Sequence, residues 1–297
     1  MHRRQFLAAS AALPLLAAPP RPAPTRFVLA CMTLPWAAFP FARGLSGVQA
    51  AGFRHVAWGD AHTEGDKRVP VLAPDAAPAV AADLGKRCRD MGLEPVMMFS
   101  TVYPEHPSAP VVLRRRLEQA GAAGVKQVLT FGHTKGGNRA VWVARFRELA
   151  PVAADRNVIL AVKQHGGDTG TGEACAAIAA EVNSPHVAVS YDAGNVLDYL
   201  DQDPIPDIRK CAGAVRSFCI KDHRRFPKKG DCGPGLGEID HYKLLHPVVA
   251  TGRDMILACE NVSVPLVGPA DTPAVVDGWA RRAREYLDLV VAGLAKL

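Results

Sequence analysis

Several residues that can carry charge or move protons follow short apolar runs in this sequence. Lys163, Gln164 and His165 come directly after the run "VILAV" (158–162), and two glycines follow them. The residues in similar positions after other runs are His133, Asp192, Lys221 and Glu260. Carboxylates, imidazoles and ammonium groups transfer protons and stabilise developing charge. A single Asp in such a place is explained equally well as a helix N-cap. Polar groups at the ends of five consecutive runs indicate a shared site.

The apolar runs that precede these residues predict eight strands. They lie at 26–32, 54–59, 94–100, 126–132, 157–164, 186–192, 215–222 and 254–261. Each run is nearly continuous, as expected for strands covered on both faces. Helix-like segments lie between them, for example at 76–92, 112–124 and 171–182. Several of the helical segments end at a glycine that stops a helix, namely Gly52, Gly92, Gly124 and Gly252.

The order of these elements predicts the fold class. Strict alternation of strands and helices, with no hairpin signal, predicts a parallel sheet. Eight units over roughly 270 residues favour a closed (β/α)8 TIM barrel over an open doubly wound sheet. No glycine-rich dinucleotide fingerprint follows the first run, which also counts against the open sheet. We expect one barrel domain over residues 25–297, with its site on the loops that follow the strands.

The first 24 residues predict an export signal and a linker. Arg3 and Arg4 precede Phe6 and Leu7, and an apolar stretch that ends in small residues follows. This arrangement is typical of a bacterial twin-arginine signal. An uncleaved membrane anchor fits less well, because the stretch is short for a bilayer span and contains Pro14. We therefore expect a periplasmic or secreted protein, without a membrane contact after signal cleavage.

Composition limits the classes of partner. The formal charge is +6, and the basic residues are scattered apart from runs at 113–116 and 222–229. The sequence therefore does not predict a clustered phosphate-contacting face, and nucleic acid is not an expected partner. The second basic run lies near the predicted site, so an anionic small molecule stays open. The seven cysteines include no CxxC pair, and their spacing predicts no particular disulfide.

Three motifs carry a resemblance to a known family. "SYDAGN" (190–195), "FCIKD" (218–222) followed by "GPGLGEID" (233–240), and "ILACEN" (256–261) resemble strand signatures of the sugar phosphate isomerase/epimerase superfamily. These proteins are xylose-isomerase-like TIM barrels. The resemblance implies one divalent metal (Mn, Mg or Zn) at the barrel mouth and a small carbohydrate or polyol as substrate. Carried over to this sequence, the implied metal ligands are Asp192 and Glu260, with His165 as a candidate third ligand.

The sequence departs from the family pattern at two implied ligand positions. Lys163 stands where the family has a glutamate, and Cys219 stands where it has a histidine. Three interpretations follow. The Lys163 ammonium neutralises the two carboxylates and no metal binds. Alternatively, a metal persists with altered ligands, such as His165, His133 or, for zinc, Cys219. In the third interpretation, burial lowers the pKa of Lys163, which then acts as a base or an imine-forming nucleophile.

These observations lead to one functional hypothesis and one alternative. We expect an exported enzyme that isomerises, epimerises or eliminates by proton transfer on a carbohydrate or polyol. Lys163 and Glu260 are the expected catalytic residues, and His165, Lys221 and His133 are expected to bind substrate. The alternative is a non-catalytic or metal-free barrel that binds a sugar or a partner protein. In the glycine-rich segment 233–240, backbone amides that cradle a phosphate and a helix cap at Asp240 are both open.

Overall fold

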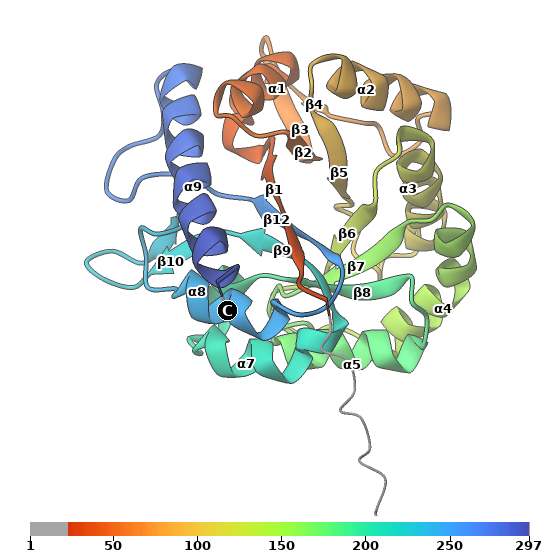
Figure 1. Ribbon diagram of the computed structural model, residues 1–297. Coiled ribbons are helices and arrows are strands. Elements are labelled where there is room, and N and C mark those ends of the chain that lie inside the picture. The colour runs from red at the N-terminus through yellow and green to blue at the C-terminus, as the bar shows by residue number, and fades with distance from the viewer. Residues whose placement is uncertain (1–22, 297) are drawn as a thin grey trace, which may run out of the picture.

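Eight parallel strands form a closed barrel in the computed structural model, which describes residues 23–296 (Figure 1). Around the ring the strands follow the order β1-β2-β5-β6-β7-β8-β9-β12. Their bounds are β1 Arg26–Met32, β2 His55–Trp58, β5 Glu94–Phe99, β6 Gln127–Phe131, β7 Ile159–Lys163, β8 Val187–Tyr191, β9 Val215–Ile220 and β12 Asp254–Cys259. Each strand coincides with one predicted apolar run. The predicted (β/α)8 barrel is confirmed.

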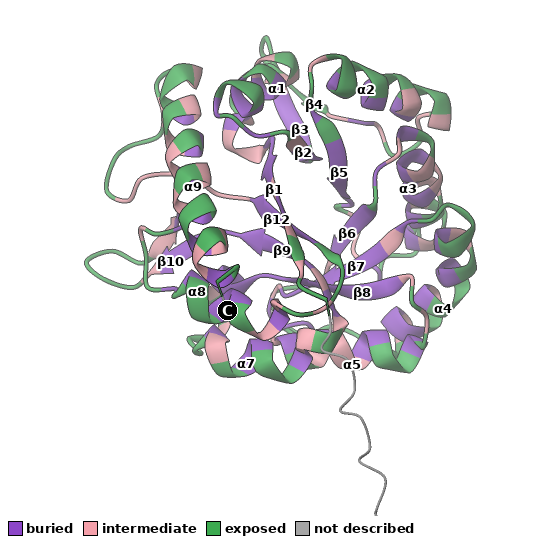
Figure 2. Cartoon of the chain, viewed as in Figure 1, coloured by how far each residue is buried: buried purple, intermediate pink, exposed green. Residues whose placement is uncertain are grey.

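Helices surround the barrel, with their outer faces exposed and the strands buried (Figure 2). They are α1 Phe41–Ala50, α2 Pro78–Asp90, α3 Ala109–Ala123, α4 Arg139–Asp155, α5 Gly172–Val182, α6 Ala193–Leu200, α7 Pro204–Cys211, α8 His241–Leu245 and α9 Pro273–Leu294, with short 3-10 turns at Leu34–Trp36, Ala212–Ala214 and His246–Val248. The four predicted helix-stopping glycines all have positive φ, between 65° and 88°. Their identity therefore has a conformational cause, since left-handed backbone disfavours residues with a Cβ.

Two layers of apolar side chains make up the core. Alternate residues of β1 divide between them: Val28, Ala30 and Met32 lie inside the barrel, whereas Cys31 packs between the strands and the helices. Cys219 of β9 belongs to the inner layer. All seven cysteines are buried and free.

Two antiparallel hairpins interrupt the alternation of strands and helices. They are β3 Ala61–Glu64 with β4 Lys67–Pro70, and β10 Asp222–Arg224 with β11 Gly230–Cys232. The expectation of strict alternation without hairpins was wrong at these places. Their strands have three or four residues and are largely polar, so they produce no apolar run. The second hairpin follows β9 and so stands at the mouth of the barrel.

No helix in the described part of the chain is long and apolar enough to cross a membrane. Most of the predicted signal segment, residues 1–22 of 1–24, lies outside the described residues.

Candidate active site at the barrel mouth

Four charged side chains gather where strands of the barrel end. Lys163 is the last residue of β7, Asp192 follows β8, Lys221 follows β9 and Glu260 follows β12. Their side chains are 3%, 0%, 6% and 17% exposed, respectively. Charged groups are rarely this buried unless they are paired. The structure therefore brings together four of the six predicted site residues.

Lys163 lies between the two carboxylates. Its Nζ donates hydrogen bonds to both carboxylate oxygens of Glu260, at 2.7 and 2.6 Å. The same Nζ is 2.9 Å from Oδ2 of Asp192 and 5.6 Å from the centre of the Phe99 ring. The ammonium is thus the shared positive partner of Asp192 and Glu260.

This arrangement fixes the charges of the centre. Burial disfavours the charged form of Lys163, but Asp192 and Glu260 outweigh it and hold its pKa well above the usual value. Burial acts against the charged form of Glu260 as well, yet Lys163 and Lys221 lower the pKa of Glu260 to about 2. For Asp192 burial outweighs both lysines, so its pKa is raised. Lys163 is therefore an ammonium at neutral pH, which disfavours its interpretation as an amine base or nucleophile. Asp192 is the carboxyl group that accepts a proton more readily.

Asp192 has both a structural role and a place in the site. Its Oδ1 accepts a hydrogen bond from the Asn195 backbone N–H at 3.0 Å and caps α6. Its own backbone N–H donates to Oε1 of Gln164 at 2.9 Å. The other carboxylate oxygen, Oδ2, is the one that faces Lys163. The helix-cap interpretation of Asp192 is thus correct for Oδ1, whereas Oδ2 stays directed toward the charged centre.

Lys221 connects this centre to the β10–β11 hairpin. Its Nζ donates to Oδ1 of Asn195 at 2.6 Å and lies 3.0 Å from Asp231 Oδ2 and 3.5 Å from Asp192 Oδ2. A Cβ on Gly194 would lie 2.6 Å from Lys221 Cε. The glycine of "SYDAGN" therefore leaves the space that the lysine side chain occupies.

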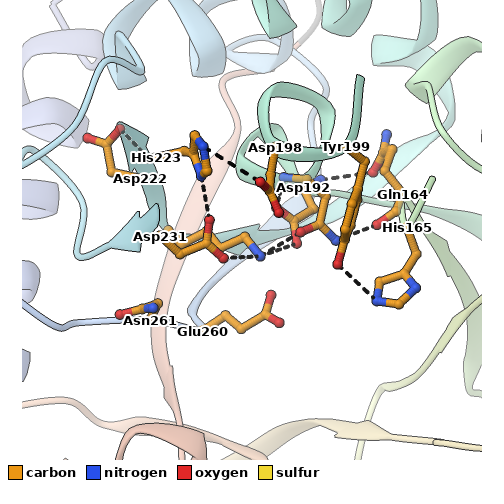
Figure 3. Close-up of polar contacts among 12 residues, drawn as sticks. Gln164, His165, Asp192, Asp198, Tyr199, Asp222, His223, Asp231, Glu260 and Asn261 are labelled. Carbon is orange, nitrogen blue, oxygen red and sulfur yellow. Dashed lines mark hydrogen bonds and ion pairs between the residues drawn. The ribbon is translucent and has the colours of Figure 1, made fainter. Parts of the chain in front are cut away.

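His223 and Asp231 extend the network and were not among the predicted site residues. His223 Nδ1 is 2.7 Å from Asp231 Oδ1, and its Nε2 is 3.8 Å from Asp198 Oδ1 (Figure 3). The His223 side chain is 1% exposed. His223 follows the predicted strand 215–222 directly and could have been included. Asp231 gives no such signal, because it belongs to a three-residue strand that no apolar pattern marks.

His165 and His133 lie on an aromatic wall beside the charged centre, which we define as Tyr103, Phe131, His133, His165 and Tyr199. The His165 ring is 4.7 Å from the ring of Phe131, and the rings of His133 and Tyr103 are 4.0 Å apart. Nδ1 of His165 is 2.7 Å from the Gly132 carbonyl oxygen, and its Nε2 is 3.4 Å from the Tyr199 hydroxyl. Burial lowers the pKa of His165, so its imidazole is neutral at neutral pH.

The turn that carries His165 requires its two glycines. Gly166 and Gly167 have φ of 79° and 50°. A Cβ on Gly166 would lie 2.4 Å from the Thr134 carbonyl oxygen, and one on Gly167 would lie 2.0 Å from that of Gly136. The loops after β6 and β7 are therefore packed backbone to backbone, which sets the position of the aromatic wall.

Only part of the implied metal site is present among the described residues. Asp192, Cys219 and Glu260 can each offer a ligand atom within 4.8 Å of the others, and His165 is outside this group. However, the Lys163 ammonium is within 2.9 Å of both carboxylates. Burial also raises the pKa of Cys219 well above its usual value, so its thiol is protonated at neutral pH. A divalent ion at Asp192 and Glu260 would have to displace the Lys163 ammonium that pairs with both, so the residues as arranged do not fit one.

Comparisons with known proteins place this geometry in context. The sequence profile of a family described as "Xylose isomerase-like TIM barrel" matches residues 45–286. A search of curated protein sequences finds no match. Among solved structures, a xylose isomerase-like TIM barrel protein from Mycobacterium smegmatis in complex with magnesium has a TM-score of 0.70 at 17% identity, over 92% of this chain and 97% of that one.

Two further solved structures have the same fold. An L-ribulose 3-epimerase has a TM-score of 0.68 at 16% identity, over 90% of this chain and 95% of its own. The IOLI protein with a zinc atom has a TM-score of 0.67 at 16% identity, over 89% of this chain and 98% of its own. The chain spans only 42% of another match, a fusion of a xylose isomerase-like TIM barrel with a 4-hydroxyphenylpyruvate dioxygenase.

Proposed function

Because this chain belongs to the xylose isomerase-like TIM barrel family, we propose that it is a carbohydrate isomerase or epimerase that works by proton transfer at the barrel mouth. The observation that carries this proposal is the buried Lys163 ammonium, which lies between the Asp192 and Glu260 carboxylates at the carboxyl ends of the strands. This is the end of such barrels where chemistry takes place. Three solved structures with this fold are named as sugar 3-epimerases, which agrees with a carbohydrate substrate.

The proposed chemistry begins with loss of a C–H proton next to a substrate carbonyl. Lys163 donates a hydrogen bond to the carbonyl oxygen and stabilises the negative charge that develops there. When Lys163 donates a hydrogen bond to the substrate, it gives up one of its hydrogen bonds to Glu260. The pKa of Glu260 therefore rises when substrate binds, and the carboxylate becomes a stronger base. Glu260 then removes the proton and leaves an enediolate. A proton that returns to the opposite face of the same carbon gives the epimer. A proton that returns to the neighbouring carbon, while the hydroxyl proton of that carbon passes to the former carbonyl oxygen, gives the isomer.

We further propose that the centre needs no divalent metal, since Lys163 already supplies the cation. In the competing arrangement, an ion displaces Lys163 and binds Asp192, Glu260 and either Cys219 or His165. The metal content of the purified protein separates these arrangements: one equivalent of Mn, Mg or Zn would contradict ours. The substitution Lys163→Glu should create manganese affinity, seen as a rise in melting temperature on addition of the ion. Lys126→Glu, at an exposed position before β6, is the matched control and should show no such rise.

The function is tested by hydrogen exchange. We expect NMR in D2O to show deuterium entering the C–H next to the carbonyl of at least one ketose or aldose in a panel of sugars. Glu260→Gln should slow this exchange by about 10²–10⁴-fold, the usual contribution of a general base. Lys126→Met should leave the rate unchanged.

The rival function is a barrel that binds a sugar or a protein without catalysis. The observation in its favour is that Lys163 and Cys219 replace two ligands that the resemblance implies. Exchange with no sugar of the panel, together with sugar-dependent stabilisation, would support the rival. If neither exchange nor stabilisation occurred, the result would support a non-catalytic barrel that binds a partner protein.

We also propose that the protein is exported through the twin-arginine route. The support is the paired Arg3 and Arg4 before an apolar stretch. Fractionation of a bacterial host that expresses the full chain should find the protein in the periplasm or medium. The Arg3→Lys/Arg4→Lys variant should stay in the cytoplasm, and an unchanged distribution would refute the proposal.

A further inference from the structure

We propose that the substrate of this site carries an anionic group, a carboxylate or a phosphate, that binds in a basic groove beside Glu260. The inference rests on the proposed function, because it assigns the substrate class of the same site. We define the basic groove as the surface between the β10–β11 hairpin and residues 263–269, with Trp279 of α9 at its side.

The groove continues into the candidate active site. A hollow of about 170 Å³ reaches Glu260 and is lined on its other side by Leu34. A second hollow of about 360 Å³ lies between the hairpin and residues 263–269. Ser263 and Trp279 line both hollows, so the two adjoin. Together they provide the volume usual for a small-molecule site, next to a carboxylate that can react.

The outer hollow carries more positive charge than its carboxylates neutralise. Arg224, Lys228 and Lys229 line it, and Asp231 is the one acidic residue among the lining residues. Asp231 is already paired with Lys221, at 3.0 Å, and with His223, at 2.7 Å.

The three cations differ in how they are satisfied. Lys229 pairs with Asp198 at 3.0 Å. The Arg224 guanidinium donates from Nε and Nη2 to the Phe226 carbonyl oxygen, which is not a charged partner. No carboxylate lies within ion-pair distance of Arg224 or Lys228 in the described part of the chain, residues 23–296. These two side chains are thus available to an anion.

A nearby alternative site for an anion is occupied by the protein itself. The glycine-rich segment 233–240 directs backbone N–H groups of Gly235 and Ile239 to the carboxylate of Asp222, each at 3.0 Å. The same segment ends with Asp240, whose side chain accepts from the Lys243 backbone N–H and caps α8. The segment therefore binds an internal carboxylate, and the helix-cap interpretation of Asp240 is correct. The cations of the basic groove are what an external anion can reach.

The physical consequence is a preference among otherwise identical sugars. A neutral sugar that fills both hollows leaves Arg224 and Lys228 solvated and gains nothing from them. A sugar with a carboxylate or phosphate gains charge-assisted hydrogen bonds, and the positive field raises its rate of encounter. Because the groove is open to solvent, this gain should decrease as salt is added.

The test compares galactose, galacturonate and galactose 6-phosphate, and the matching series of glucose. Calorimetric titration of the full mature protein at low salt should show the anionic member of a series binding at least about tenfold more tightly than the neutral one. The Arg224→Met/Lys228→Met variant should lose that advantage and keep its affinity for the neutral sugar. Lys126→Met is the control for removal of a basic side chain elsewhere. The carboxylated and phosphorylated members identify which anion the groove accepts.

The outcomes separate this inference from the proposed function. If neutral and anionic sugars bind equally, if no anionic sugar binds, or if the double variant keeps the anionic advantage, the inference is overturned. If the native protein and the double variant then exchange sugar hydrogen at the same rate, the proposed function is retained without the inference. Anion-dependent binding through the groove without any exchange would uphold the inference and remove the catalytic proposal.

Discussion

Removal of the Lys163 ammonium is the most direct test of the charged centre. The Lys163→Met variant keeps the approximate volume of the side chain and leaves Asp192 and Glu260 close together without their shared cation. Breaking a buried ion pair by removing one partner costs about 3–5 kcal/mol, because the other charge stays buried. Solvent screening lowers this cost only slightly, because the side chains of Lys163, Asp192 and Glu260 are 3%, 0% and 17% exposed. For a protein of this size the loss corresponds to a decrease of about 6–12 °C in melting temperature near pH 7.

The destabilisation should depend on pH in a definite direction. In the native protein the pKa of Glu260 is about 2, below its usual 4.5, so its stabilising contribution is complete above the usual value and is lost as the pH falls toward 2. In Lys163→Met the carboxylates keep only the more distant Lys221 ammonium, so burial raises their pKa values above those in the native protein. As the pH falls through these raised pKa values, the carboxylates become protonated and the variant loses its uncompensated buried charge. The difference in melting temperature between the two proteins should therefore be smaller at about pH 5 than at about pH 7.

The assay is thermal unfolding followed by circular dichroism at both pH values. Lys86→Met, which breaks the exposed pair between Lys86 and Asp90 on α2, is the control and should change little at either pH. Lys163→Met/Glu260→Gln should recover part of the lost stability, because one uncompensated charge is gone. A Lys163→Met protein that melts within about 2 °C of the native protein near pH 7 would show that the ammonium does not hold the carboxylates together.

Three further predictions concern other parts of the molecule. Gly194→Ala should displace Lys221 and lower the rate of sugar hydrogen exchange with little loss of stability, as its Cβ would lie 2.6 Å from the lysine chain; an unchanged rate would remove Lys221 from the site. Asp207→Ala should lower the free energy of unfolding by about 2–4 kcal/mol in denaturant titrations, because its buried carboxylate accepts from the Tyr191 hydroxyl at 2.8 Å and from backbone N–H groups at the start of α5; a loss below about 1 kcal/mol would contradict this. All seven cysteines should resist a thiol reagent in the native protein and all seven should react after denaturation, whereas a smaller number would reveal a disulfide.

The barrel and part of the site could be predicted because both depend on local patterns. Apolar runs mark strands that are covered on both faces, and the residue after each run is directed to the mouth by the direction of the strand. This reasoning was sufficient for Lys163, Asp192, Lys221 and Glu260. It does not depend on knowing which strands are neighbours.

The remaining features depend on contacts that no local pattern contains. Lys163 and Glu260 are 97 residues apart, and their 2.6 Å separation follows from barrel closure and strand register. Asp231 reaches the site on a hairpin too short and polar to be recognised. His165 lies two residues beyond the last hydrogen-bonded pair of its strand, where the alternation of side chains no longer applies, so its direction toward Gly132 and Tyr199 could not be foreseen.

A cationic side chain is present in every folded molecule, whereas a metal ion must be bound from solution. The occupancy of a metal site follows mass action and falls when the free ion is scarce or a chelator competes for it. The ammonium between Asp192 and Glu260 is attached to β7 by covalent bonds, so its local concentration is set by folding and is the same in every molecule. In the metal-free centre that we propose, folding alone supplies the cation, with no loading step and no dependence on the metal content of the surroundings.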